Sequence, residues 1–174
     1  MDPDSDLIRI RSSKSREVLL NPGALAAAIR QANLSPGRET GGVLLGRFTG
    51  DKSVPIIYKC LPSTSDCQHS RASFSRGTRG LATLLRREFV RGYQYIGEWH
   101  THPDGPSQPS CRDHLTMARI ARSACYQIAD PLLMILSGSE ARGWKAAVRR
   151  YNKMGVTDRF AEIEASAALL EHEL

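Results

Sequence analysis

The spacing of apolar and polar positions changes along the chain and divides it into strand-like and helix-like stretches. Alternation, or a short apolar run bounded by turn formers, is typical of a β-strand, and apolar residues three or four apart are typical of an amphipathic helix. The patterns predict strands at 7–11, 16–20, 41–48, 54–61, 93–102, 131–138 and 143–151, and helices at 21–37, 78–92 and 110–129. The tail at 158–174 is expected to be partly helical.

The helical stretches carry end signals and apolar faces. Asn21 can cap the first helix, Pro22 suits its first turn, and Pro36 with Gly37 is expected to end it. The apolar faces are predicted to consist of Leu81, Leu84, Leu85 and Phe89 in the second helix, and of Leu115, Ala118, Ala121, Cys125 and Ile128 in the third.

The predicted elements together indicate a fold class. The runs at 41–48 and 54–61 are typical of a β-hairpin with Gly50 and Asp51 in its turn. Residues 62–77 are polar and serine-rich without periodicity, which indicates a long surface loop. Strands mixed with helices favour an α/β (α+β) fold with a mixed sheet. A length of 174 residues with 41% hydrophobic content fits a single domain over 1–174.

The net charge of +6 bears on the partners to be expected. Only 6% of the residues are aromatic, and they do not interleave with the arginines as a stacking platform for nucleic acid requires. An acidic protein surface, or a merely solvated face, is therefore favoured over nucleic acid. No apolar run approaches the roughly 20 residues of a membrane span. The N-terminal stretch lacks the apolar region of a secretion signal, so a cytoplasmic setting is expected.

One stretch of the chain combines residues that can bind a metal ion. His100 and His102 stand at i and i+2 near the end of a predicted strand, so both imidazoles lie on one face. Pro103 ends the strand, and the chain returns at Ser110, which can cap the next helix with Asp113 in its first turn. Two neutral imidazoles and one carboxylate suit a catalytic zinc that keeps an open position for water. One zinc ion per chain is expected, and it lowers the pKa of such a water to about 7.

Hydrolysis also needs a base, and the residues alone leave two glutamates open. Glu98 is in phase with the histidines on the same strand face. Glu39 precedes the predicted strand at 41–48 and can face the metal from a neighbouring strand, where Gly41 and Gly42 allow close approach of a backbone or a substrate. Spacing does not decide between them.

The remaining histidines and cysteines are assigned no part in this site. His69 and His114 are interpreted as surface groups or as groups beside a ligand, and His172 as solvated. No cysteines are spaced CxxC, so reduced thiols are expected and a zinc ribbon is not. Cys111 is expected to point away from the face of Asp113, and Trp99 is expected in the core on the side opposite the histidines.

Two motifs resemble those of a known family. The stretch HTHPDGPSQPSCRD resembles the H-[ST]-H-P-x6-S-x-x-D signature of the JAB/MPN metalloproteases, also called JAMM. In this resemblance His100, His102 and Asp113 match the metal ligands and Ser110 matches the motif serine. Upstream, ETGGVLLG resembles the family's E-x-x-G-x-L-x-G strand, so Glu39 matches the catalytic glutamate.

The resemblance implies a fold and a chemistry. It implies a mixed, curved β-sheet flanked by helices, and hydrolysis of peptide or isopeptide bonds, often behind the C-terminal glycines of ubiquitin-like proteins. It favours Glu39 as the base and leaves Glu98 as a bystander or a group behind the ligands. It also implies that Ser110 helps to stabilise the oxyanion, whereas the residue by itself is equally a helix cap.

A narrower resemblance concerns the stretch YIGEWHTHP, which is similar to that of small stand-alone bacterial members. These members are associated with antiphage operons that carry ubiquitin-like conjugation machinery or a conjugated nucleotidyltransferase. The expected function is deconjugation, with the C-terminal tail of a ubiquitin-like or otherwise conjugated protein as substrate. The loop at 62–77 and a sheet edge are expected to hold that tail. The alternatives are a non-catalytic JAB/MPN scaffold and a DNA-repair-associated JAB-domain protein.

Overall fold

The computed structural model describes residues 6–51, 53–69, 74–75 and 77–165. Its elements are β1 (Ile8–Arg11), β2 (Glu17–Leu20), α1 (Pro22–Asn33), β3 (Gly41–Phe48), β4 (Pro55–Pro62), β5 (Gln68–His69), β6 (Phe74–Ser75), α2 (Leu81–Val90), β7 (Gln94–Pro103), α3 (Cys111–Arg122), β8 (Leu132–Ser139), β9 (Gly143–Asn152), β10 (Gly155–Arg159) and β11 (Ile163–Ala165). No helix in this described part of the chain is long and apolar enough to cross a membrane.

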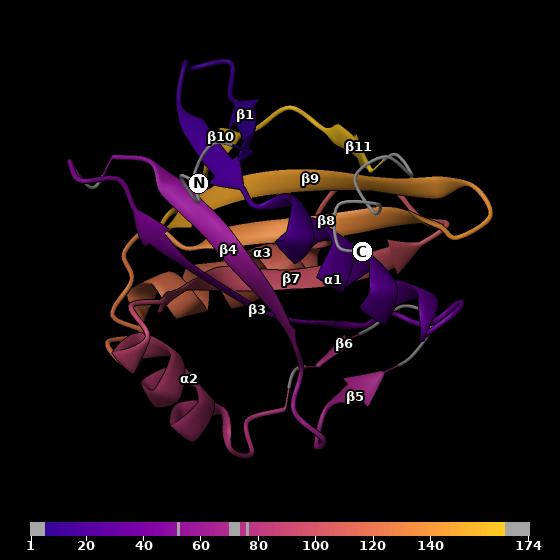
Figure 1. Ribbon diagram of the computed structural model, residues 1–174, viewed down its shortest axis with the longest axis horizontal. Coiled ribbons are helices and arrows are strands. Elements are labelled where there is room, and N and C mark those ends of the chain that lie inside the picture. Colours follow the sequence, from indigo (N-terminus) through magenta and orange to yellow (C-terminus); the bar gives the residue numbers. More distant parts are fainter. Residues whose placement is uncertain (1–5, 52, 70–73, 76, 166–174) are drawn as a thin grey trace.

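The main sheet has nine strands and β7 near its centre (Figure 1). The order is β1-β2-β4-β3-β7-β8-β9-β10, and β11 pairs with β9 beside β10. The pairs β2–β4 and β7–β8 are parallel and the others are antiparallel, so the predicted mixed sheet is confirmed. The predicted hairpin is also confirmed, because β3 and β4 are antiparallel neighbours closed by a bond from Thr49 N to Val54 O of 2.9 Å.

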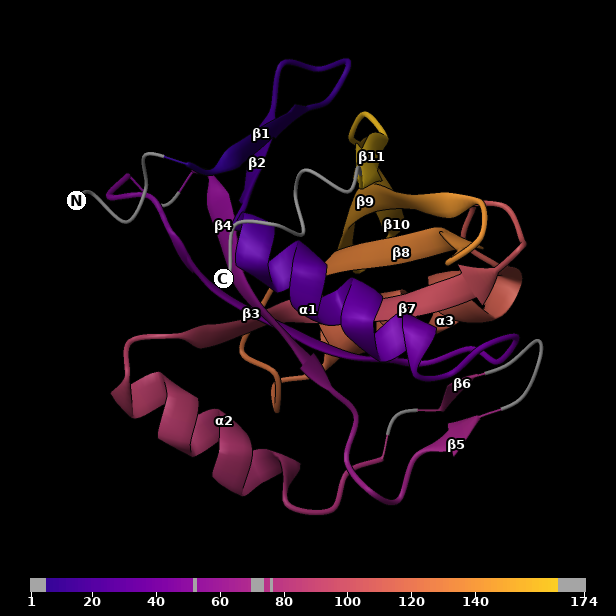
Figure 2. The ribbon, with the colours of Figure 1, turned by 45° about the vertical axis from the view of Figure 1, so that its right-hand side comes forward.

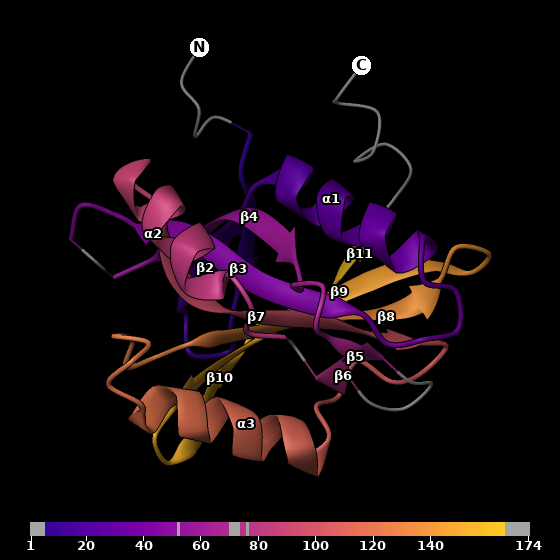
Figure 3. The same ribbon diagram turned by 90° about the horizontal axis from the view of Figure 1, so that it is seen from below.

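Helices cover both faces of this sheet (Figure 3). On one face α1 buries Leu25, Ala28 and Ile29 in a cluster that also contains Trp99. On the other face α3 contributes its buried apolar side chains to a second cluster. Trp99 is fully buried and its indole Nε1 donates to the carbonyl of Leu61 at 2.9 Å, so the prediction that it lies in the core is confirmed. The two clusters make β7 a buried strand on both faces.

The first helix begins as predicted and ends earlier. The side chain of Asn21 accepts a hydrogen bond from Ala24 N at 3.2 Å, and Pro22 occupies the first turn. Such a cap satisfies one of the donors that a helix start leaves without an internal partner. The helix ends at Asn33, and Gly37 beyond it takes a φ of +67°, which glycine adopts without strain.

The apolar faces of the other two helices were predicted partly wrongly. Leu81 of α2 is buried as expected, but Phe89 is 69% exposed. In α3 the predicted stripe is wrong at Leu115, which is 74% exposed, and the buried residues of the helix are Met117 and Ile120. The predicted helix was also too long, since α3 ends at Arg122 and Cys125 is exposed beyond it. The predicted stripe from Leu115 and the buried pair Met117 and Ile120 both have helical spacing. The buried pair lies on the same face of the helix as Asp113, and this face packs on the sheet.

Two segments predicted as irregular or helical contain strands. The polar stretch at 62–77 includes the short antiparallel pair β5–β6, which Figure 2 shows beside the main sheet, on the side away from β1 and β2. The tail at 158–174 contains the end of β10 and all of β11, which pair with β9, so a helix there is wrong as far as residue 165. The rest of the tail, with His172, lies outside the described residues.

Candidate metal centre

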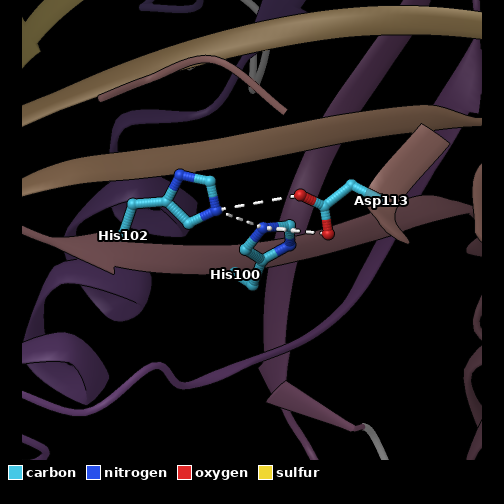
Figure 4. A group of neighbouring side chains, drawn as sticks. All are labelled: His100, His102 and Asp113. Atoms are coloured by element: carbon cyan, nitrogen blue, oxygen red, sulfur yellow. Dashed lines mark hydrogen bonds and ion pairs between the residues drawn. The ribbon is translucent and has the colours of Figure 1, made fainter. Parts of the chain in front are cut away.

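Strand β7 brings the two histidines of the motif to one place. Because alternate residues of a strand share a face, His100 and His102 point to the same side of the sheet. In Figure 4 their ring nitrogens converge, and the two Nε2 atoms lie 3.0 Å apart. The histidines face the side covered by α3, opposite to Trp99.

Helix α3 supplies the carboxylate. The Asp113 carboxylate points at both rings (Figure 4), with Oδ1 3.5 Å from His100 Nε2 and Oδ2 3.8 Å from His102 Nε2. One ligand atom of each of the three residues lies within 4.8 Å of the other two. His100 is buried, and the other two are half-buried. Three converging donors at such distances can hold a single divalent metal ion.

The hydrogen bonds made by the candidate ligands suit them to binding a metal ion. His102 Nδ1 lies 2.8 Å from the carbonyl of Pro106, which only accepts, so Nδ1 carries the proton and Nε2 presents its lone pair. Burial acts to raise the pKa of Asp113, but hydrogen bonds and charge from His100 and hydrogen bonds from Ser110 outweigh it and lower the pKa. The carboxylate is therefore held in the ionised form that a metal requires.

Ser110 caps α3 and holds Asp113 at the same time. Its Oγ accepts from Asp113 N at 3.2 Å, and both its backbone N and its Oγ lie 2.7 Å from Asp113 Oδ2. This is a capping box, in which the first and last members satisfy each other's donors. The predicted helix cap is confirmed, and the single hydroxyl proton points at Asp113.

The register of β3 against β7 places Glu39 beside the histidines. Gly41 pairs with His100, and one residue earlier Thr40 O accepts from Thr101 N at 2.7 Å while Thr40 N donates to Thr101 Oγ1 at 2.9 Å. Continuing this pairing puts Glu39 opposite His102 on the same face. Burial raises the pKa of Glu39, and His102 and His100 oppose that shift when their imidazoles are protonated. A carboxylate with a raised pKa beside the ligands suits a general base.

Glu98 occupies a different position. It is on the histidine face of β7 but is 8% exposed, and its Oε1 accepts from Tyr95 Oη at 2.7 Å. Glu98, His100 and Asp113 all contribute to the lining of a cleft of about 380 Å³ between α3 and the sheet. The cleft therefore reaches His100 and Asp113, and Glu98 forms part of its wall.

The glycines before the histidine strand make close contacts, as expected. A Cβ on Gly41 would lie 2.2 Å from the carbonyl oxygen of Trp99, and one on Gly42 would lie 1.9 Å from that of Leu61. Both contacts are impossible for a side chain, so these positions permit close approach of neighbouring backbones. That approach brings the start of β3, and with it Glu39, against the end of β7.

Several groups at the site carried no signal in the sequence. The carbonyl of Pro106 bonds to His102, and the hydroxyl of Thr101 accepts from the backbone N of Thr40. Residue spacing in the sequence does not reveal either contact. His114 is half-buried and bonds to Tyr151, which agrees with a group beside a ligand. Among the described residues Cys111 is exposed and is not part of the metal-binding group. The side chain of His69 lies outside the described part.

Comparisons with known proteins give one family and a consistent set of relatives. The Prok-JAB family, described as prokaryotic homologs of the JAB domain, matches residues 22–151. The "CD-NTase/cGAS isopeptidase" of Enterobacter hormaechei subsp. hoffmannii (strain UCI 50) is 40% identical over 103 residues, which are 59% of this chain and 57% of that protein. The chain thus spans little more than half the length of that relative.

A second relative and a solved structure extend the match. The "Probable metalloprotease y4qB" of Sinorhizobium fredii (strain NBRC 101917 / NGR234) is 32% identical over 116 residues, 64% of this chain and 70% of that protein. The solution structure of protein DSY2949 from Desulfitobacterium hafniense has the same fold, with a TM-score of 0.56 at 23% identity over 80% of this chain and 87% of that one. With most of its length matched, the chain belongs to the Prok-JAB family, the prokaryotic homologs of the JAB domain.

Proposed function

We propose that this protein is a zinc-dependent isopeptidase or peptidase that hydrolyses the bond after the C-terminal tail of a conjugated protein. The observation that carries the proposal is the convergence of His100, His102 and Asp113 with Glu39 beside them. A relative named as an isopeptidase and another named as a probable metalloprotease support it. A non-catalytic scaffold would have no need of this complete set.

The donor set fits zinc. Zinc takes imidazole nitrogens at about 2.0–2.1 Å in a tetrahedral arrangement, so its ligand atoms lie about 3.4 Å apart. The contacts of 3.0, 3.5 and 3.8 Å among His100, His102 and Asp113 lie on both sides of that value. Two imidazoles and one carboxylate leave a fourth position, as in other catalytic zinc sites. When bound, the ion supplies a Lewis acid and a water of pKa about 7.

Glu39 performs the proton transfers in this proposal. Its carboxylate accepts a proton from the attacking water as the new bond to the carbonyl carbon forms. It then delivers that proton to the departing amine as the carbon–nitrogen bond breaks, so the residue ends in its starting form. If the bond is isopeptide, the departing group is a lysine ε-amine. Burial raises the pKa of Glu39 and so makes its carboxylate a stronger base towards the attacking water.

Ser110 is the proposed oxyanion donor. Its hydroxyl now donates to Asp113 Oδ2, so it must turn away from that oxygen to serve a developing negative charge. The backbone N of Ser110 remains bonded to the same carboxylate oxygen at 2.7 Å. Asp113 therefore keeps one donor from the capping box when the hydroxyl turns.

The proposed substrate is a protein with an extended C-terminal tail. The relative named "CD-NTase/cGAS isopeptidase" points to a conjugated nucleotidyltransferase. The resemblance of the stretch YIGEWHTHP to that of small bacterial members points to antiphage defence as the setting. The segment 62–77 and a neighbouring sheet edge would hold the tail by main-chain pairing. The net charge of +6, with Arg86, Arg87 and Arg91 exposed on and beside α2, favours an acidic surface on the substrate.

The proposal is tested with purified protein and candidate substrates. We expect that ubiquitin-like or nucleotidyltransferase fusions are cut after a defined C-terminal residue, that a chelator stops the cleavage and that added zinc restores it. Glu39→Gln should keep zinc at one ion per chain while turnover is lost. His102→Ala should lose zinc itself. Cleavage that continues at the wild-type rate in Glu39→Gln, or in excess chelator, would contradict the proposal.

A further inference from the structure

The first turn of α3 carries Asp113 but has almost no apolar anchorage. The buried residues of the helix are Met117 and Ile120, one and two turns further on. Near its end the helix is also tied by Arg122, whose side chain donates to the carbonyl of Lys153 at 2.7 Å. These contacts fix the C-terminal part of α3 on the sheet and leave the placement of its first turn to other groups.

A polar contact to β9 lies in that first turn. Tyr151 of β9 is fully buried, and its hydroxyl lies 3.0 Å from Nδ1 of His114. The two rings are 5.7 Å apart between centroids. Burial raises the pKa of Tyr151, and the charge of Asp113 adds to the rise. The phenol therefore hydrogen-bonds to His114, the residue that follows Asp113 in the chain.

We propose that His114 and Tyr151 are positioning residues that hold the first turn of α3 against β9, so that the Asp113 carboxylate meets the two histidines. This inference rests on the metal site of the proposed function. It assigns the pair no contact with substrate or metal, since His114 bonds to Tyr151 and is outside the metal-binding group of the described residues.

The contact complements the capping box. Ser110 fixes the Asp113 carboxylate relative to the helix backbone, because both belong to the same turn. That box cannot fix the turn relative to β7, where the histidines are. The His114–Tyr151 bond joins residues 37 positions apart and ties the turn to the sheet. Groups behind a metal ligand typically change metal affinity by about 10- to 100-fold when they are removed.

The test measures zinc affinity of the folded protein, by competition with a chromophoric chelator, and the Tm of the metal-free form. Tyr151→Phe removes only the hydroxyl, and His114→Ala removes the other partner. We expect each to raise the zinc Kd about tenfold. His114→Asn keeps an amide atom near the place of Nδ1 and should restore affinity to within about threefold of wild type. The double variant should be no weaker than either single one, because both remove the same bond.

Two controls separate positioning from stability. Leu115→Ala changes the exposed neighbour of His114 in the same turn and should leave the zinc Kd unchanged. Ile120→Val weakens the buried end of the helix and should lower the Tm of the metal-free protein without altering the zinc Kd.

The outcomes distinguish this inference from the metal site on which it rests. If Tyr151→Phe and His114→Ala lower Tm but bind zinc as wild type does, the pair has a structural role only and the inference is overturned. If Ile120→Val weakens zinc binding as much as Tyr151→Phe does, then any destabilisation of the protein lowers its zinc affinity, and the inference also fails. If wild-type protein binds no zinc, the proposed function fails first and takes this inference with it.

Discussion

Replacement of Ser110 by glycine and by alanine separates its role as a helix cap from its proposed role as an oxyanion donor. Both substitutions remove the hydroxyl, but they destabilise the helix by different amounts. The hydroxyl accepts from Asp113 N and donates to Asp113 Oδ2, while the backbone N of Ser110 makes a separate bond to that oxygen. Ser110→Gly and Ser110→Ala both keep the backbone bond. Ser110→Thr keeps the hydroxyl as well and is the matched control.

The magnitudes for the two roles differ enough to be told apart. Loss of an N-cap side chain to alanine costs about 1 kcal/mol of stability, and loss to glycine only a few tenths. Loss of an oxyanion donor lowers kcat by about 10²–10³, which corresponds to about 2.7–4 kcal/mol in the transition state. If the hydroxyl serves the oxyanion, Ser110→Gly and Ser110→Ala lose the same large factor in kcat despite their different stabilities.

The assay is cleavage of the fusion substrate at saturating zinc, with kcat and KM measured separately and urea unfolding recorded on the same samples. Zinc content is measured for each variant, because the hydroxyl also contacts the ligand Asp113. Ser110→Thr should retain most of the turnover. A kcat for Ser110→Gly within about threefold of wild type, with zinc fully bound, would refute the oxyanion role and leave Ser110 as a cap alone.

Three further changes test other parts of the structure. Hydrogen bonds from Thr64 and from backbone amides lower the pKa of Asp66 to about 2, so these bonds stabilise the base of the loop above a pH of about 4 and are lost as the pH falls towards about 2. The hydrogen-exchange protection of those amides should therefore fall over that pH range, and unchanged protection would contradict this prediction. Glu162→Gln should weaken the charged bond that Ser107 donates from the loop after β7 and reduce zinc affinity a few-fold, measured by chelator competition; equal affinity would show that this loop needs no such support. Gly41→Ala should destabilise the protein by about 1–3 kcal/mol or more in urea unfolding, because its Cβ would meet a backbone oxygen at 2.2 Å; a wild-type midpoint would contradict the close approach.

The buried face of α3 shows how much of the packing can be predicted from sequence patterns. Leu115 and Met117 both belong to stripes with helical spacing, so periodicity alone allows either face of α3 to pack. The ligand position contains the deciding information, since Asp113, Met117 and Ile120 are spaced i, i+4 and i+7 and therefore share a face. Once Asp113 is assigned to the metal, the buried residues of the helix follow.

The placement of the two glutamates shows what spacing cannot supply. The alternation of β7 correctly placed Glu98 on the histidine face, and the hairpin of β3 and β4 was also predicted. Which residue of β3 lies opposite which residue of β7 depends on the pairing of strands far apart in sequence. The pairing of Gly41 with His100 is a fact of tertiary structure, and it brings Glu39 to the site.

The parallel pairing of β7 with β8 has a consequence for how the protein is made. The strand that carries both histidines ends at Pro103, but β8 begins only at Leu132, after the crossover that contains α3. Pairings between distant segments form slowly and only when the whole intervening chain is available. A nascent chain that has just passed Asp113 therefore contains all three proposed ligands and still lacks the strand that flanks the two histidines. Metal capture is expected to follow folding here, in contrast to zinc fingers, where the ion itself drives the chain to fold.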